Sequence, residues 1–312
     1  MFFTTSSETP EEVGMSSIWL SKEKDTYLNS FCFGYRPSIE IDPYYLGYML
    51  RSPGFRSKMI VLAQGISRYN ISKTKAMQLS ILLPSLQEQI KIGKTLNTIS
   101  NLITLHQRKY DKLVNVKKAL LDKMFPKNGE LVPKLRFKGF TDTWEQCEAK
   151  ELVSITTGNS NTQDQKDDGI YPFFIRSETP VKSNRYLYDE EAVITIGDGQ
   201  IGKVFHYVNG KFDLHQRCYK MADFKELSGK YFYYYFSTMF YNRAMKMTAK
   251  ATVDSVRLEM ISDMNIKYPK SKDEQAKISS LLSNVETHIT LHQRKYEKLV
   301  NIKKALLQKM FV

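Results

Sequence analysis

Residues 103–125 read ITLHQRKYDKLVNVKKALLDKMF, and residues 289–311 read ITLHQRKYEKLVNIKKALLQKMF. Only three of these 23 positions differ, and the two segments lie 186 residues apart. The same offset pairs Cys32 with Cys218 and Gln89 with Gln275, so a gapless alignment extends back from the two segments. The chain therefore consists of two copies of one unit, each a variable globular part followed by a near-invariant tail.

Each tail is predicted to be one long helix. Ser85–Glu88 and Ser271–Glu274 fit the capping-box pattern S-x-x-E, which satisfies backbone donors at a helix start. Apolar residues then recur at alternating spacings of four and three, a heptad pattern typical of a coiled coil. In the first copy this seam comprises Ile92, Leu96, Ile99, Ile103, His106, Tyr110, Leu113, Lys117, Leu120 and Met124. Because each helix follows its own globular part, we expect the two helices to pair antiparallel.

One position of the seam is polar in both copies, His106 in the first and His292 in the second. Antiparallel pairing about the helix midpoints would bring the two imidazoles together. We interpret them as a polar layer that sets the register of the helices. Metal binding is the alternative.

Composition limits the class of protein. A chain of 312 residues with 42% hydrophobic residues predicts about two folded domains. The net charge of +13 favours a polyanionic partner, with nucleic acid as the first candidate. The three cysteines are scattered, which predicts neither a disulfide framework nor a zinc site. With no run of 18 apolar residues and no basic segment in the first eight positions, we expect a cytoplasmic protein without a membrane span.

The globular parts are predicted to have an α+β fold. In the second unit, apolar runs bounded by turn residues predict strands over residues 152–156, 171–175, 192–196, 204–208 and 218–221. Asn209-Gly210 is typical of a hairpin turn. Tyr231–Phe236 predicts a buried helix with its hydroxyls at the edge, and Pro43–Leu50 predicts its equivalent in the first unit.

Sequence motifs for catalysis are weak. Gly197–Gly202 matches G-x-G-x-x-G, but a strand and not a helix is predicted to follow, so we interpret it as a tight loop. Asp42-Pro43-Tyr44-Tyr45 is close to the D-P-P-Y of adenine methyltransferases, but one proline is missing and no glycine-rich loop precedes it. We interpret it as a helix start. No P-loop sequence occurs, so the sequence predicts no enzyme active site.

Residues that can read DNA bases occur in the expected loops, because Arg, Lys, Asn and Gln match the donor and acceptor groups of base edges. The second unit offers Asn159, Lys182, Arg185, Gln200, Gln216, Arg217, Lys250, Thr252 and Arg257, and the first offers Arg68, Tyr69 and Asn70. Taken singly, each is also a common surface residue, which is the alternative.

The chain resembles the specificity subunit of type I restriction-modification systems. The duplicated variable part, the near-identical helix, LPSLQEQ at residues 83–89 and FTDTWE at residues 140–145 carry the resemblance, which covers essentially the whole chain. It implies two target-recognition domains, each reading half of a split double-stranded DNA site, joined by two long antiparallel coiled-coil helices. The resemblance also implies that the subunit catalyses nothing and directs adenine methylation and restriction by its partners.

The partners implied are methyltransferase subunits, two of which would dock on the coiled coil, and endonuclease subunits that join through them. S-adenosylmethionine, ATP and magnesium would belong to those partners, and this chain would carry no cofactor. Because the two tails are almost identical, we expect them to form the assembly surface. The residues expected to bind partners are Tyr110, Leu113, Tyr296 and Leu299.

The first unit departs from the pattern, because only 31 residues precede Cys32. Phe2–Thr5 matches the middle strand at Val193–Ile196, so the opening Trp segment and early strands lack a counterpart. We expect an amino-terminally truncated first domain that contributes less to specificity, which favours Arg217 and Arg257 over Arg36 and Arg68 for base contact. A scaffold fragment that binds methyltransferase subunits without reading a full site is the alternative function.

These comparisons predict five parts. They are a partial first target-recognition domain (residues 1–84), the first conserved helix (85–126), a linker (127–140), the second target-recognition domain (141–269) and the second conserved helix (270–312).

Overall fold

The computed structural model describes residues 1–311 except 22, 24–26, 128 and 249–254. Packing divides the chain into two units. Unit 1 comprises Met1–Lys112 and Ile289–Val312, and unit 2 comprises Leu113–His288. Each long helix therefore contributes one part to each unit. The five boundaries expected from the sequence cut the chain at other points and stay a prediction.

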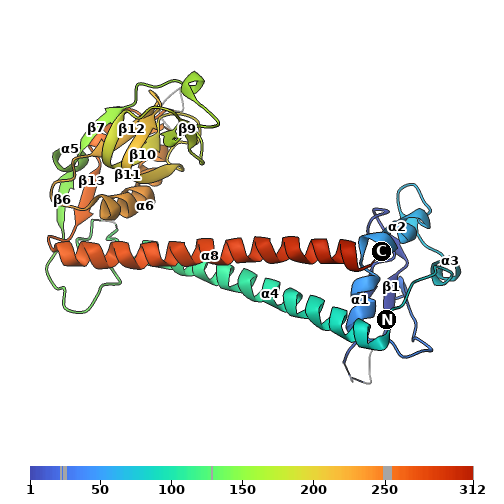
Figure 1. The fold of residues 1–312 in the computed structure, drawn as a ribbon. Coiled ribbons are helices and arrows are strands. Elements are labelled where there is room, and N and C mark those ends of the chain that lie inside the picture. Colours follow the sequence, from blue (N-terminus) through green and yellow to red (C-terminus); the bar gives the residue numbers. More distant parts are fainter. Residues whose placement is uncertain (22, 24–26, 128, 249–254, 312) are drawn as a thin grey trace. The chain divides into compact units, whose positions relative to one another are not determined.

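Unit 1 is built on a three-stranded antiparallel sheet with strand order β3-β1-β4. Its elements are β1 (Phe2–Thr4), β2 (Ser6–Ser7), β3 (Ser16–Ser17), β4 (Cys32–Gly34), α1 (Pro43–Met49), α2 (Pro53–Val61), β5 (Tyr69–Asn70), α3 (Lys73–Met77) and parts of α4 (Leu86–Lys123) and α8 (Lys272–Met310). Phe3 of β1 packs with Leu46 of α1 and Met59 of α2 in one apolar core. Figure 1 shows β1 beside α1.

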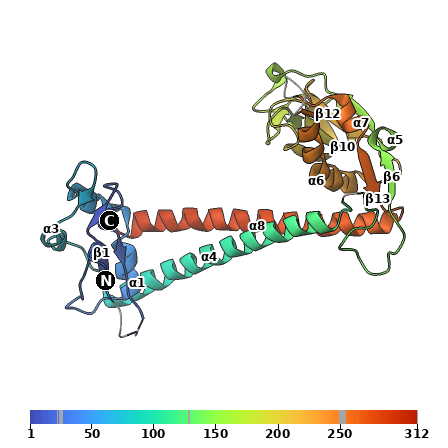
Figure 2. The ribbon, with the colours of Figure 1, turned by 180° about the vertical axis from the view of Figure 1, so that it is seen from behind.

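Unit 2 contains a larger sheet of six strands, in the order β7-β12-β10-β11-β8-β9, and a separate β13-β6 pair. Its own elements are β6 (Glu145–Glu148), α5 (Ala149–Leu152), β7 (Ser154–Thr157), the 3-10 helix η1 (Thr162–Asp164), β8 (Tyr171–Phe174), β9 (Val181–Ser183), β10 (Tyr188–Ile196), β11 (Phe205–Leu214), β12 (Cys218–Ala222), α6 (Gly229–Thr248), α7 (Leu258–Ser262) and β13 (Asn265–Tyr268). Figure 2 shows α7 next to α5 in this unit.

The predicted equivalence of the middle strands is confirmed. β1 lies between β3 and β4, as β10 lies between β11 and β12. The ladders place Thr4 opposite Cys32 and Ile196 opposite Cys218. Thr4 and not Thr5 therefore corresponds to Ile196, one residue away from the sequence-based match.

Two details of the predicted strands are wrong. Asn209-Gly210 is not a turn, because β11 runs through it and pairs Asn209 with Glu191 and Gly210 with Glu190 of β10. Gly210 has φ 123°, a backbone conformation that glycine tolerates and that other residues rarely adopt. The hairpin instead turns at residues 197–204, which include the Gly197–Gly202 segment predicted as a tight loop. Leu152 ends α5 and does not belong to β7.

The aromatic helix α6 covers the sheet of unit 2, as Figure 1 shows. Phe232, Phe236 and Phe240 repeat at helical spacing and are fully buried in the larger core. The hydroxyl of Tyr231 donates to the carbonyl of Lys267 at 2.7 Å, which satisfies the buried phenol. The predicted buried helix is confirmed, but the predicted placement of its hydroxyls at the edge is wrong for Tyr231, whose hydroxyl is buried.

The two long helices pair antiparallel, as predicted. In unit 1, His106 Nδ1 lies 2.8 Å from His292 Nδ1, so the expected polar layer exists. One ring must donate and the other accept, which means that both Nδ1 atoms cannot carry a proton together. Burial and the charges of Lys295 and Lys109 lower the pKa of His106, which favours its neutral form. In unit 2, Lys117 pairs with Glu286 at 2.7 Å.

A buried glutamine ties the start of each long helix to its globular part. Gln275 is fully buried; its side-chain oxygen accepts from the N–H of Ser228, and its amide donates to the carbonyls of Pro269 and Glu226. Gln89 repeats this arrangement by accepting from Asp42 N and donating to the carbonyl of Pro84. Both glutamines therefore hold the N-terminus of a packed helix, α6 or α1, against the long helix.

The close approach of α1 to α4 requires a glycine. A Cβ at Gly93 would lie 2.3 Å from Asp42 Oδ1 and 2.7 Å from Tyr45 N. A larger residue there would push the start of α1 away from α4. Gly93 therefore allows the contact that Gln89 fixes.

The offset between the two copies is one residue shorter over residues 71–84 than before and after them. Buried Ile71 and Val256 precede the five-residue helices α3 and α7, and the hydroxyls of Tyr45 and Tyr231 donate to the carbonyls of Leu82 and Lys267. Residues 71–84 therefore correspond to 256–269, at an offset of 185, because these buried contacts recur in both units. Residues 80–83 of unit 1 match β13 of unit 2.

Replacing Gln275 with alanine should strongly destabilise the chain. The variant removes three hydrogen bonds of the Gln275 side chain, of which the one to the carbonyl of Pro269 is buried and the other two are partly buried, so it should lower the free energy of unfolding by about 2–4 kcal/mol. Urea unfolding followed by circular dichroism measures this. The exposed Gln293→Ala on the same helix serves as control and should change stability by less than about 0.5 kcal/mol. Equal effects of the two variants would contradict the role of Gln275 in holding α8 to its globular part.

Candidate nucleic-acid interface

Four loops of unit 2 meet at one end of its sheet, where strands β7, β10 and β11 end. Backbone hydrogen bonds join them: Gly197 N donates to the carbonyl of Arg217 at 2.8 Å, Val256 N to that of Gly197 at 2.7 Å, and Gln216 N to that of Ser160 at 2.9 Å. Each loop leaves a strand end or precedes a short helix, so the sheet fixes their spacing. Loops placed in this way on a rigid sheet are common binding surfaces.

Predicted DNA-contacting residues gather at this end of the sheet. Exposed side chains there come from four separate stretches of sequence and are Asn159, Gln200, Gln216, Arg217 and Arg257. Arg257 immediately precedes α7. The tertiary structure therefore brings together donors and acceptors that are nearly 100 residues apart in the chain.

Arg217 lies in a small charged cluster. Its guanidinium contacts Asp198 at 2.8 Å, and Arg176 contacts the same carboxylate at 3.2 Å. Partial burial of Asp198 opposes ionisation, but the two arginines hold its pKa below its usual value. The side chain of Arg217 remains 60% exposed, so Asp198 orients the guanidinium and leaves donors free for a ligand.

Sequence reasoning missed Arg176 and treated Asp198 only as part of a loop. Arg176 directly follows the apolar run at 171–175, where a strand end is the expected place for a functional side chain. A groove of about 290 Å³ beside the cluster is lined by Asp198, Gln216, Arg217 and Ser255. A second of about 330 Å³ is lined by Arg176 and Thr162.

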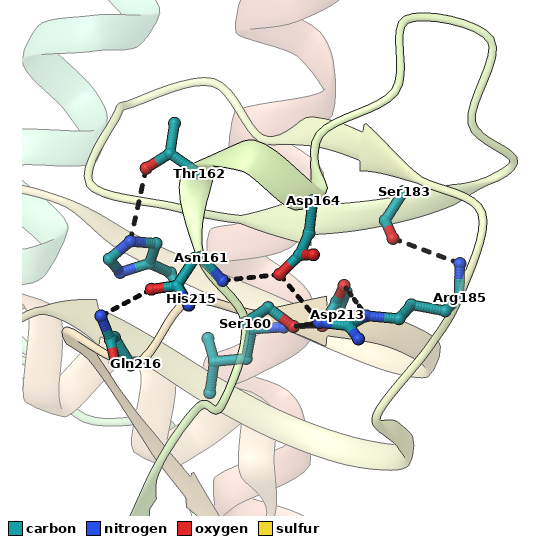
Figure 3. A network of polar contacts seen from close by, with 10 residues as sticks. Ser160, Asn161, Thr162, Asp164, Ser183, Arg185, Asp213, His215 and Gln216 are labelled. Atoms are coloured by element: carbon teal, nitrogen blue, oxygen red, sulfur yellow. Dashed lines mark hydrogen bonds and ion pairs between the residues drawn. The ribbon is translucent and has the colours of Figure 1, made fainter.

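Arg185 has a different environment from Arg217. Figure 3 shows its guanidinium beside Asp164, Asp213 and Ser160. It contacts Asp164 and the hydroxyl of Ser160 at 2.9 Å, and the fully buried Asp213 at 3.5 Å. Asp213 also accepts from the Ser160 hydroxyl and from Leu214 N. Arg185 therefore holds the 158–164 loop against β11, and its expected role as a DNA contact stays a prediction.

His215 orders the turn that carries Gln216 and Arg217. Its Nδ1 accepts from Arg217 N at 3.0 Å, so the neutral ring presents the Nε2 proton toward Thr162 Oγ1 at 3.4 Å. Burial, followed by the charges of Arg176 and Arg217, lowers the pKa of His215. The amide of Gln216 donates to Asn161 Oδ1 at 2.6 Å, as Figure 3 shows.

The remaining predicted residues of unit 2 fall elsewhere. Lys182 is exposed on β9, an edge strand of the sheet. Lys250 and Thr252 lie outside the described residues.

Unit 1 has the same framework with other side chains. Thr5 N donates to the carbonyl of Phe31, as Gly197 N does to that of Arg217. Phe31 therefore occupies the place of Arg217, and the Arg68 guanidinium lies 4.9 Å from its ring. Arg68 also donates to the hydroxyl of Ser6 at 2.7 Å, and the Tyr69–Asn70 strand pairs with β2. The corresponding edges of the two units thus present different chemistry.

The residues expected to bind partners lie on the seam of the long helices. Tyr110, Leu113, Tyr296 and Leu299 are all half-buried. Apolar side chains that are more exposed occur at matching positions of the two tails, Leu105 with Leu291, Val114 with Val300, and Val116 with Ile302. Both helices therefore present the same outward apolar groups.

The described part of the chain contains no group of three or more His, Cys, Asp and Glu residues arranged to hold a metal ion. None of its helices is both long and apolar enough to cross a membrane.

Comparison with known proteins identifies relatives of this architecture. The family model for the type I restriction modification DNA specificity domain matches residues 9–115 and 141–301. The chain is 26% identical over 165 residues to the EcoDI type I restriction enzyme specificity subunit of Escherichia coli, covering 53% of this chain and 36% of that protein. It is 22% identical over 289 residues to a putative MjaX specificity subunit of Methanocaldococcus jannaschii, covering 86% of this chain and 67% of that protein.

A solved structure shares the fold. The crystal structure of a type I restriction-modification S subunit from M. genitalium superposes with a TM-score of 0.75 at 14% identity, covering all of this chain and 82% of the other. At this identity the likeness bears on the fold alone. It agrees with the predicted α+β units and antiparallel helices.

Arg185→Ala should destabilise unit 2. The substitution removes the cation that faces the buried Asp213 carboxylate, which should cost about 1–3 kcal/mol of unfolding free energy. Urea unfolding followed by tyrosine and tryptophan fluorescence measures the change. Lys182→Ala, a neighbouring exposed cation, should have almost no effect. An unchanged midpoint for Arg185→Ala would show that the network adds nothing to stability.

Proposed function

Because the chain belongs to the family of type I restriction modification DNA specificity domains, we propose that it is the non-catalytic DNA-recognition subunit of a type I restriction-modification complex. In this proposal the two units read the two halves of a split double-stranded site. The chain directs adenine methylation and restriction, which partner subunits perform in the cytoplasm.

One observation carries the proposal of sequence reading. The two units share the backbone contacts that hold their loops, yet Arg217 in one unit stands where Phe31 stands in the other. A common framework with different side chains at the same edge suits two sites that differ in sequence. Arginine and glutamine can each make paired hydrogen bonds to base edges, so Arg217 and Gln216 are suited to direct readout.

Charge supports DNA as the partner. The net charge of +13 favours binding to the phosphate backbone, which supplies most of the sequence-independent affinity. Phosphate contacts position a protein on the duplex, and base contacts then select the sequence. Lys182 at the edge strand is suited to the first task, and Arg217 and Arg257 to the second.

The near-identical helices are proposed to bind two methyltransferase subunits, through which endonuclease subunits would join. Equal surfaces suit equal partners in a complex with twofold character. The outward apolar pairs, such as Val114 with Val300, would provide this surface, while Leu113 and Leu299 would hold the helices in register. S-adenosylmethionine, ATP and magnesium would be bound by the partner subunits.

A scaffold that binds methyltransferase subunits without reading a complete site is the second candidate. The observation that favours it is the small sheet of unit 1, three strands against six in unit 2. The two functions differ in whether unit 1 affects the methylated sequence.

Methylation mapping should separate the two arginines. When the chain is expressed with its methyltransferase partner, Arg217→Ala should relax one base position of the methylated motif, because losing a base contact costs about 1–3 kcal/mol. Arg68→Ala should leave the motif unchanged or lower methylation uniformly. An altered motif in the Arg68 variant with none in the Arg217 variant would reverse the ranking of the units. No sequence-specific methylation with the wild-type chain would contradict DNA reading.

Binding of the methyltransferase should depend both on the seam between the two long helices and on their exposed apolar side chains. Leu113→Asp with Leu299→Asp should disrupt the seam, lowering helicity and losing co-purification with the methyltransferase. Val114→Asp with Val300→Asp should lose co-purification while helicity by circular dichroism stays intact, because these side chains are 39% and 37% exposed and are not part of the seam. Asn115→Asp with Asn301→Asp adds the same charges next to them and should keep the complex. Retention of the complex by the Val114 and Val300 variant would rule out this surface.

A further inference from the structure

One carboxylate of unit 2 is shared by two arginines that lie at the ends of different strands. Arg176 follows β8, Asp198 follows β10, and Arg217 precedes β12. Nη1 of Arg217 donates to Oδ2 of Asp198 at 2.8 Å, and Nη1 of Arg176 donates to the same oxygen at 3.2 Å. A guanidinium carries five N–H donors, and in both arginines the hydrogen bonds to described side chains use Nη1 alone. Each arginine therefore keeps donors for a ligand.

The backbone around Asp198 is fixed on both sides. Gly197 directly precedes it, and a Cβ at this position would lie 2.6 Å from the carbonyl oxygen of Arg217, so the close approach of the two loops requires a glycine. Val256 N donates to the carbonyl of Gly197 at 2.7 Å, and Arg217 N donates to His215 Nδ1 at 3.0 Å. The carboxylate and the guanidinium of Arg217 are therefore placed by a rigid framework before any ligand binds.

Asp198 lies between two grooves, and each groove has its own arginine. The groove of about 290 Å³ is lined by Asp198, Arg217 and Gln216. The groove of about 330 Å³ is lined by Asp198, Arg176 and Thr162. Each groove thus offers one guanidinium and one neutral hydrogen-bonding side chain, with the carboxylate common to both.

This mixture of charges suits base edges better than phosphates. The carboxylate of Asp198 repels an anionic phosphate and offsets part of the positive charge of the two arginines. A G·C base pair instead presents two guanine acceptors, O6 and N7, next to the cytosine N4 donor in the major groove. Guanidinium donors beside a carboxylate acceptor match that pattern. The cluster is therefore better suited to reading bases than to holding the DNA backbone.

The spacing of the two arginines limits which bases they can reach. Because both donate to the same carboxylate oxygen, their Nη1 atoms lie no further apart than the sum of the two hydrogen-bond lengths. This is less than two steps of a DNA duplex, in which successive base pairs are about 3.4 Å apart. A single guanine uses both of its major-groove acceptors for one arginine. Two arginines at this spacing therefore suit neighbouring base pairs.

We propose that Arg176 and Arg217 each bind O6 and N7 of a guanine in two neighbouring G·C base pairs of the half-site that unit 2 reads. Asp198 is the positioning residue that holds both guanidiniums at the spacing of these pairs. Arg176 thereby becomes a specificity-determining residue. The inference rests on the proposed function, because it requires that unit 2 reads DNA.

Methylation mapping of genomic DNA tests the pair, with the chain expressed together with its methyltransferase partner. The wild-type motif should contain two adjacent G·C pairs in one half. Arg217→Ala should lower the preference for guanine about tenfold or more at one of them, and Arg176→Ala should do so at its neighbour. Lys150→Ala serves as control, because this exposed cation of unit 2 pairs with Glu148 and Asp263 and should leave the motif unchanged.

Asp198→Asn tests the positioning role. The variant keeps the size of the side chain and removes its charge, so it should relax both positions. In the Arg217→Ala background it should add nothing at the position of Arg217 and still relax the position of Arg176, because only the second contact is left to lose. A residue with a merely structural role would lower methylation uniformly and leave the motif unchanged. Asp263→Asn, an exposed carboxylate paired with Lys150, is the matched control.

DNA binding by the purified complex provides a second measurement that does not require methylation. Fluorescence anisotropy compares a duplex with the wild-type motif and one with an A·T pair in place of the G·C pair assigned to Arg176. The wild-type complex should prefer the first duplex about tenfold or more, and the Arg176→Ala complex should bind both equally. The dependence of its affinity on salt should stay as in the wild type, because no phosphate contact is lost.

Three results would overturn the inference and leave the proposed function standing. They are a wild-type motif without adjacent G·C pairs, an unaltered motif in the Arg176→Ala variant, and weaker binding of all sequences by that variant with a shallower salt dependence. The last result would assign Arg176 to a phosphate. Absence of sequence-specific methylation by the wild-type complex would contradict the proposed function as well.

Discussion

The buried glutamine at the start of each long helix is the contact on which the rest of the architecture depends. Gln275 satisfies the N–H of Ser228 and the carbonyls of Pro269 and Glu226, so it fixes α6, β13 and α8 to one another. Gln89 does the same for α1 and α4. Each glutamine therefore anchors a long helix to the globular part from which that helix starts.

The far ends of the helices complete the cores of the globular parts. Phe125, just after α4, packs against Tyr231 and Tyr235 of unit 2, and Phe311, just after α8, packs against Tyr45 of unit 1. Each globular part therefore uses one long helix as its exit and the end of the other as part of its interior. The near-identical part of each tail, residues 103–125 or 289–311, therefore contributes both to the seam and to the interior in which it ends.

The two units differ in the side chains that they present at the loops they share. The loop edge of unit 2 presents Arg217 and Arg176 around Asp198, whereas the matching edge of unit 1 presents Phe31 with Arg68 over its ring. The surrounding backbone hydrogen bonds are the same. A protein built in this way can change the surface that it offers to a ligand while these backbone contacts stay the same.

The sequence by itself determined the duplication, the two helices and their antiparallel pairing, because a heptad pattern and a near-identical repeat are local signals that survive without knowledge of the fold. It also indicated the polar layer at His106 and His292 and the buried aromatic helix. Only the tertiary structure decided that Asn209-Gly210 continues a strand, since the ladder with β10 outweighs the local turn preference. Only the structure brought Asn159, Gln200, Arg217 and Arg257 to one end of the sheet. It also distinguished Arg185, which contacts a buried carboxylate, from Arg217, whose guanidinium is largely exposed. These distinctions depend on contacts between residues far apart in the chain, and no spacing within a single segment encodes them.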